Sequence, residues 1–78
     1  MRLDKFLKVS RLIKRRTVAN QACDADKILV NGKAARASYA VKIGDEIVIN
    51  MGKNPLKVKV CSLAETIGKD GAADMYEI

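Results

Sequence analysis

The short length of the chain is the feature that most limits what it can fold into. A domain of 78 residues buries only about 60% of the surface that its unfolded chain exposes, so its core is too small to enclose a deep substrate cavity. The sequence also contains no His, which removes the commonest general base and the commonest metal ligand. We therefore expect one domain, residues 1–78, that binds a partner and is not an enzyme.

The rest of the composition is typical of a folded protein without a cofactor. Hydrophobic residues make up 49% and charged residues 31% of the chain, as in globular domains. Cys23 and Cys61 are too far apart for a CxxC motif, so we expect both to be reduced and partly buried, with no metal bound. No apolar stretch is long enough for a signal peptide or a membrane span, which predicts a cytoplasmic protein.

The net charge of +6 lies entirely in the first 16 residues. That segment contains seven Lys and Arg but only one acidic residue, Asp4, whereas the remaining 62 residues contain eight basic and eight acidic ones. So many like charges repel one another unless a polyanion neutralises them. The cluster therefore indicates a surface that binds a nucleic acid or an anionic membrane.

Residues 2–10 fit an amphipathic helix. At about 100° per residue, Leu3, Phe6, Leu7 and Ser10 fall on one face, and the cationic side chains fall on the other. A helix that lies on a membrane would show a larger exposed apolar face with aromatic anchors. Nucleic acid is therefore the better candidate for the polyanion.

A second helix is predicted from Val18 to about Ala25, with Thr17 as its N-cap. Its small apolar residues favour close packing on the first helix. Arg15 and Arg16 would lie at the positive end of its dipole, where they would strengthen an anion site.

The remainder of the chain predicts a small antiparallel sheet. Asn31-Gly32 is the strongest short signal for a two-residue hairpin turn. The expected strands are 27–30, 33–37, 47–49 and 56–61, followed by an edge strand over 75–78. Residues 62–71 are ambiguous, with a half-turn over 63–67. The fold class is therefore α+β, with two N-terminal helices packed on a small curled antiparallel sheet.

Several of these segments resemble the S4 RNA-binding domain over at least residues 1–49. They are the opening amphipathic helix, Arg16-Thr17 at the start of the second helix, residues 28–32 (ILVNG) and residues 41–45 (VKIGD). Residues 1–17 and 72–76 (AADMY) are similar to small bacterial ribosome quality-control factors that consist of a free-standing S4 domain, which are themselves similar to a small ribosome-associated heat-shock protein. The resemblance implies an S4 core motif over about 1–49 and C-terminal strands over 46–78. S4 domains often have Gly at the exit of the second helix, where this chain has Asp26.

The resemblance also implies a function. Factors of this kind bind the large ribosomal subunit after a stalled ribosome has split, contact both the peptidyl-tRNA and nearby rRNA, and help a partner factor to add alanine to the nascent chain without mRNA. The resemblance to these factors implies RNA contacts at Arg2 and Arg16. The residue types themselves add further candidates for RNA binding, which are cationic except for the hydroxyl of Thr17: Lys5, Lys8, Arg11, Arg15, Thr17, Lys33 and Arg36.

Other interpretations stay open at this point. The chain would also suit an accessory S4 module that presents structured RNA to a modifying or tRNA-charging enzyme. Lys42, Asp45 and Glu46 are close enough in sequence for catalysis, although Gly44-Asp45 is better explained as a turn before a strand. The three aromatic residues, Phe6, Tyr39 and Tyr76, are scattered, which disfavours stacking on successive bases and favours recognition of phosphates and RNA shape. We expect a monomer away from the ribosome, with no membrane partner.

Overall fold

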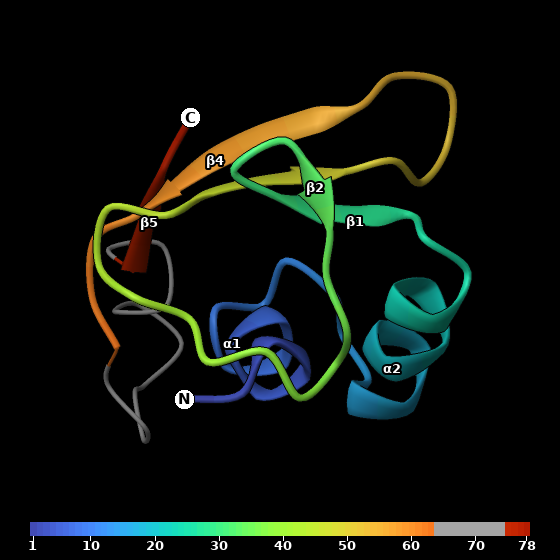
Figure 1. Cartoon of the computed structure of the whole chain (residues 1–78), viewed down its shortest axis with the longest axis horizontal. Helices are drawn as coiled ribbons and strands as arrows, with labels where there is room; N and C mark the ends of the chain where they lie inside the picture. Colours follow the sequence, from blue (N-terminus) through green and yellow to red (C-terminus); the bar gives the residue numbers. More distant parts are fainter. Residues whose placement is uncertain (64–74) are drawn as a thin grey trace.

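The computed structural model describes residues 1–63 and 75–78, and its two helices lie together on one side of a sheet (Figure 1). The helices are α1 (Leu3–Val9) and α2 (Arg16–Asp24). The sheet has five antiparallel strands in the order β2-β1-β3-β4-β5. Its strands are β1 (Ile28–Val30), β2 (Lys33–Ala34), β3 (Glu46–Ile49), β4 (Leu56–Val60) and β5 (Tyr76–Glu77). The predicted α+β architecture is confirmed.

The core lies between the helices and the sheet. Alternate strand residues point toward the helices and are buried: Ile28, Val30, Ile47, Ile49, Val58 and Val60. The apolar face of α1 meets them with Leu3, Phe6 and Leu7, each 0% exposed. Full burial of one such side chain contributes about 1.5–3 kcal/mol, so this single layer of contacts holds the two helices on the sheet.

The start of α2 differs from the prediction. Arg15 is the N-cap, with an extended backbone and no side-chain cap hydrogen bond, and Thr17 lies inside the first turn. The prediction of a Thr17 cap was therefore wrong. The reason is tertiary: Arg16 is held by an ion pair with Asp4 of α1, and this contact stabilises the first turn in place of a local cap.

The predicted turn at Asn31-Gly32 is confirmed in detail, and the exit of α2 at Asp26 also has a left-handed backbone. Asn31 and Gly32 both have positive φ, at 52° and 86°, as a two-residue hairpin with a type I′ turn requires. Asp26 takes the left-handed position after α2, with φ 58°, and its N–H donates to the Cys23 carbonyl while the Lys27 N–H donates to that of Ala22. Asp26 thus ends the helix in the way that Gly usually does.

The return strand is shorter than expected. Instead of continuing to residue 37, β2 ends at Ala34, and residues 36–41, here called the cap segment, leave the sheet and cross the start of α1 (Figure 1). There the Leu3 N–H donates to the Tyr39 carbonyl over 2.8 Å, and the Asp4 N–H donates to the Ala37 carbonyl over 3.2 Å. The first amides of a helix have no acceptor within the helix. The cap segment leaves the sheet and supplies carbonyl acceptors to two of these amides in α1.

The cysteines are both free, but only one is buried. Cys23 packs in the core from α2, as expected. Cys61 is exposed, so the prediction that it is partly buried was wrong. Val58 and Val60 point inward, and the alternation of the strand therefore directs Cys61 outward. The predicted half-turn over 63–67 and residues 72–74 fall almost wholly outside the described residues, whereas Met75 just beyond them is fully buried.

Candidate nucleic-acid interface

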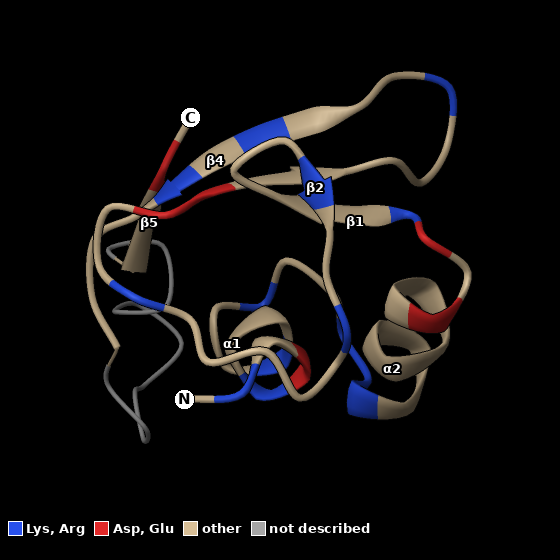
Figure 2. Cartoon of the chain, in the orientation of Figure 1, with Lys and Arg blue, Asp and Glu red and all other residues tan. Residues whose placement is uncertain are grey.

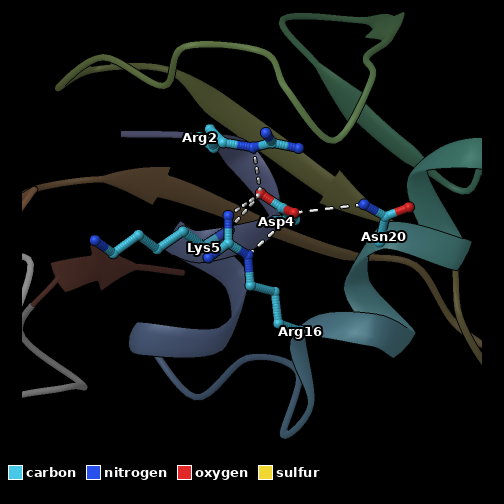
Figure 3. A network of polar contacts seen from close by, with 5 residues as sticks. All are labelled: Arg2, Asp4, Lys5, Arg16 and Asn20. Carbon is cyan, nitrogen blue, oxygen red and sulfur yellow. Dashed lines mark hydrogen bonds and ion pairs between the residues drawn. The ribbon is translucent and has the colours of Figure 1, made fainter.

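A buried carboxylate joins the two helices at the most basic part of the molecule. Asp4 of α1 is 2% exposed, and it lies between Arg2 and Arg16 (Figure 3). Arg2 Nε donates to Oδ1 over 3.2 Å, and Arg16 Nε donates to Oδ2 over 3.1 Å. Longer contacts of 3.5 Å come from Arg16 Nη2 and from Asn20 Nδ2 of α2. We call Arg2, Asp4, Arg16 and Asn20 the Asp4 cluster.

Asp4 is held in its ionised form. Burial alone would raise its pKa, but the hydrogen bond and charge of Arg16, the Lys5 N–H at 2.9 Å and the charge of Arg2 outweigh that effect, so the pKa lies below its ordinary value. One negative charge thus faces two positive ones. The Asp4 cluster keeps a net positive charge even though its carboxylate is fully hydrogen bonded.

The two arginines keep most of their donors for another partner. A guanidinium has five N–H donors; among the described residues, Arg2 donates only through Nε, to Asp4, and Arg16 donates to Asp4 through Nε and Nη2. Their side chains are 52% and 47% exposed. Arg2 therefore presents both terminal nitrogens and Arg16 presents Nη1, in orientations that Asp4 fixes, which suits the bidentate recognition of phosphate oxygens.

The other basic residues of the first 16 surround this cluster. Figure 2 shows that Lys and Arg gather around α1 and the start of α2. Lys5 is half-buried on α1, and Lys8, Arg11, Arg15 and Thr17 are exposed. The first turn of α2 adds amide donors, since the N–H groups of residues 16–18 have no acceptor among the described residues. These amides form the N-terminal, positive end of the α2 dipole, where an anion is stabilised.

Arg11 has an unusual backbone. Its φ is 63°, and the other described non-glycine residues with positive φ are Asp26 and Asn31, two types that tolerate this region. The Arg11 N–H donates to the Lys8 carbonyl and the Ile13 N–H to that of Leu7, which ends α1. An Arg at a position that favours Gly places a cation at the turn between the two helices.

Lys33 and Arg36 differ in how close their backbones lie to the Asp4 cluster. Arg36 precedes Ala37, whose carbonyl accepts from Asp4, so the backbone of Arg36 runs beside the first turn of α1. Lys33 lies on β2 at the edge of the sheet. The structure thus groups the residues of positions 2–17, brings the Arg36 backbone next to them, and leaves Lys33 on a separate element.

The Lys42, Asp45 and Glu46 group has structural partners. Asp45 is 8% exposed and accepts hydrogen bonds from Asn31 Nδ2 at 3.1 Å, from the Tyr39 hydroxyl at 3.0 Å and from the Lys42 N–H at 2.9 Å. Burial would raise its pKa, but these donors keep it below the ordinary value. Glu46 pairs with Lys57 at 2.9 Å. Asp45 therefore ties the β1–β2 turn to the cap segment.

Four residues that matter here were not among the candidate RNA-binding residues: Asp4, Asn20, Tyr39 and Asp45. Asp4 is the lone acidic residue in the basic segment, and that isolation is a signal that favours an ion pair. No comparable signal distinguishes Asn20. Among the described residues, no group of three or more Cys, Asp or Glu side chains is placed to hold a metal ion, and no helix there is long and apolar enough to cross a membrane.

Comparison with known proteins agrees with this arrangement. A family model of the S4 domain matches residues 1–47. The RQC P-site tRNA stabilizing factor of Halalkalibacterium halodurans is 51% identical over 78 residues, which span all of this chain and 89% of that protein. The protein of the same name from Bacillus subtilis is 53% identical over 78 residues, with 100% of this chain and 91% of the relative covered.

A solved structure has the same fold. Heat Shock Protein 15 of Vibrio cholerae, described as trimeric, superimposes with a TM-score of 0.91 at 28% sequence identity, over 99% of this chain and 79% of that one. None of these names denotes an enzyme. The chain therefore belongs to the S4 domain family and, within it, to the group of RQC P-site tRNA stabilizing factors.

Proposed function

We propose that this protein is a cytoplasmic, non-catalytic RNA-binding factor of ribosome quality control. It binds the large ribosomal subunit that carries stalled peptidyl-tRNA, contacts both the tRNA and the rRNA, and supports mRNA-independent alanine tailing of the nascent chain. The relatives' name, RQC P-site tRNA stabilizing factor, supports the tRNA part of this proposal. The alanine-tailing factor is a partner on the same subunit, and the protein is a monomer away from it.

The Asp4 cluster is the observation that carries the proposal. Two half-exposed guanidinium groups from two elements are oriented by one buried carboxylate. Because they are oriented in advance, little side-chain entropy is lost when they bind phosphates. The amides of residues 16–18 and the exposed cations around them extend the same positive surface.

This surface suits structured RNA more than a base sequence. Contacts from Arg, Lys, hydroxyl and backbone N–H groups go mainly to phosphates and sugars, which fix the position of a protein on folded RNA. The role of such a factor is to hold a tRNA and an rRNA element in a fixed relation. No reaction centre is needed for that, which agrees with the structural roles of Asp45 and Glu46.

The test is capture of ribosomal particles by the tagged full-length protein, followed by sequencing of the bound RNA. We expect large subunits without small subunits, together with peptidyl-tRNA. The Arg16→Ala variant should lose this material, whereas Lys53→Ala, which removes one exposed Lys from the β3–β4 turn, should retain it. Free mRNA as the main product would contradict the proposal. A stable enzyme partner without ribosomal subunits would favour an accessory S4 module.

A further inference from the structure

A hollow lies between the β1–β2 hairpin and the cap segment. It has a volume of about 640 Å³, which is within the range of small-ligand sites. Val30, Asn31, Lys33, Ala35, Arg36 and Tyr39 are among the residues that line it. No Asp or Glu of the described residues is part of this lining, so its two charged groups, Lys33 and Arg36, are both cations. We call it the hairpin hollow.

The hairpin register directs Lys33 to this hollow. Lys33 pairs with Val30 across the β1–β2 ladder, and residues directly opposite each other point to the same face of a sheet. Val30 is buried on the face that packs on the helices. Lys33 is therefore on the helix side of the edge strand, where Arg36 also lines the hollow.

The walls of the hairpin hollow are fixed by one carboxylate. Asp45 accepts from the Tyr39 hydroxyl at 3.0 Å and from Asn31 Nδ2 at 3.1 Å, and Asn31 Oδ1 accepts from the Glu46 N–H at 3.0 Å. Tyr39 is half-buried, and its hydroxyl donates to Asp45. Its ring is therefore held in place before any ligand binds.

The remaining lining consists of small side chains, of which only that of Ser38 is polar. Val30, Ala34 and Ala35 line the same hollow as Tyr39 and carry small apolar side chains. Small side chains leave room for a flat group beside the ring, and the two cations at the rim suit a phosphate. A nucleobase joined to a phosphate has this combination of properties.

We propose that the hairpin hollow binds one unpaired RNA nucleotide, whose base packs against Tyr39 and whose phosphate pairs with Lys33 and Arg36. This inference rests on the proposed function, because it assigns a second RNA contact to the same factor. The two sites differ in chemistry: the Asp4 cluster offers oriented donors and no aromatic ring, whereas the hairpin hollow combines a ring with cations. One Tyr serves one base, which is consistent with the scatter of aromatic residues along the chain.

The test compares two RNA probes on the full-length, nitrogen-15-labelled protein by NMR. One probe is hexauridylate, whose bases stack weakly on one another, and the other is a short blunt RNA duplex without unpaired nucleotides. We expect hexauridylate to shift the amide signals of residues 33–39 most. The duplex should instead shift those of α1 and the start of α2.

Variants separate the hairpin hollow from general electrostatics. Lys33→Ala with Arg36→Ala should weaken hexauridylate binding about tenfold or more and duplex binding about twofold or less. Lys53→Ala with Lys57→Ala removes the same number of charges from the β3–β4 hairpin and should change neither binding by more than about twofold. Tyr39→Phe keeps the ring but loses its hydrogen bond to Asp45, so it should weaken hexauridylate binding less than the Lys33 and Arg36 double variant does.

Three outcomes would overturn the inference: no binding of hexauridylate, shifts confined to α1 and α2, or equal weakening by the two double variants. These readouts use no ribosomes. If the hairpin hollow fails while tagged protein still captures large subunits, the proposed function stands without it. If capture fails while hexauridylate still binds at residues 33–39, the hairpin hollow stands as an RNA site and the quality-control role is wrong.

Discussion

Arg16 of α2 donates through Nε to Oδ2 of Asp4 in α1 over 3.1 Å, across a separation of twelve positions in the chain. This bond connects folding to function, because it joins the two helices and also fixes the direction of a half-exposed guanidinium. The same carboxylate orients Arg2 from the other side (Figure 3). Asp4 is thus a positioning residue for both arginines.

Asp4→Asn should therefore affect stability and binding together. The variant keeps the side-chain size but loses the charge and one acceptor oxygen, so we expect the free energy of unfolding to fall by about 1.5–3 kcal/mol, the range for hydrogen bonds to charged groups. Chemical denaturation measures this loss. Binding to large subunits should also weaken at temperatures where the variant is folded, although a negative charge has been removed. Tighter binding of Asp4→Asn would show that the carboxylate only reduces the positive charge.

The contrast between α1 and its surroundings shows what the sequence can predict. The buried face of Leu3, Phe6 and Leu7 follows from helical periodicity, and the Asn31-Gly32 hairpin follows from the backbone preferences of two residues. Both are local properties, and both were confirmed. The acceptors for the α1 amides come from Ala37 and Tyr39, more than thirty residues away along the chain. No local pattern encodes such a contact.

The candidate site likewise has one feature that the sequence shows directly and others that depend on the fold. The basic character of residues 1–16 is visible in the sequence, because charge needs no fold to be counted. The pairing of Arg16 with Asp4 needs the helix packing, and so does the start of α2 at Arg16. The role of Tyr39 needs the approach of Asp45 from the turn that precedes β3. Direct RNA contact by any of these residues stays a prediction.

Acid should destabilise the fold through Asp4 and Asp45. Both carboxyl groups have a pKa below their ordinary value of 3.8 in the folded protein. As the pH falls, the unfolded chain binds these protons first, so their contribution to stability is complete well above pH 3.8 and is lost as the pH falls through the lowered pKa values.

Thermal unfolding across this range tests the acid effect. The melting temperature of the natural protein should fall steeply between about pH 5 and pH 2. Asp45→Asn should unfold at a lower temperature at neutral pH, because it loses acceptor capacity for Asn31, Tyr39 and Lys42. Its melting temperature should also depend less on pH. An unchanged pH dependence in Asp45→Asn would assign the acid sensitivity to other groups.

The two thiols should differ in reactivity. Burial raises the pKa of Cys23 to about 11, with smaller contributions from the charges of Asp4 and Asp24, whereas Cys61 is exposed. Near pH 8, iodoacetamide should label Cys61 in the folded protein and leave Cys23 unlabelled until denaturant is added. Peptide mass spectrometry identifies the labelled residue, and Cys61→Ser should leave the folded chain unlabelled. Equal labelling of the two thiols in the natural protein would contradict the burial of Cys23.

Arg11 should lower the stability of the fold but strengthen the binding of RNA. Its φ of 63° costs an L-residue about 1 kcal/mol relative to Gly. Arg11→Gly should therefore raise the free energy of unfolding by about that amount while weakening RNA binding. Arg11→Ala removes the same cation but keeps the backbone cost, so it should weaken binding equally without stabilising the fold. Denaturant titration and binding to large subunits measure the two effects. Unchanged binding in both variants would remove Arg11 from the interface.

The geometry of Arg2 and Arg16 should matter as well as their charge. Arg16→Ala should weaken binding to large subunits that carry peptidyl-tRNA by about 1–3 kcal/mol and reduce the salt dependence by about one unit, as for one lost phosphate contact. Arg16→Lys keeps the charge but loses the planar guanidinium that bonds Asp4 and RNA at once. We expect it to retain the salt dependence and still lose affinity.

Arg2 provides the matched comparison, because it uses a single N–H on Asp4 where Arg16 uses two. Arg2→Lys should therefore lose less stability than Arg16→Lys. Binding is measured by co-sedimentation with purified large subunits at several salt concentrations, and circular dichroism checks that each variant is folded. Full activity of both Lys variants would show that the interface responds to charge alone and that orientation by Asp4 contributes nothing to RNA binding.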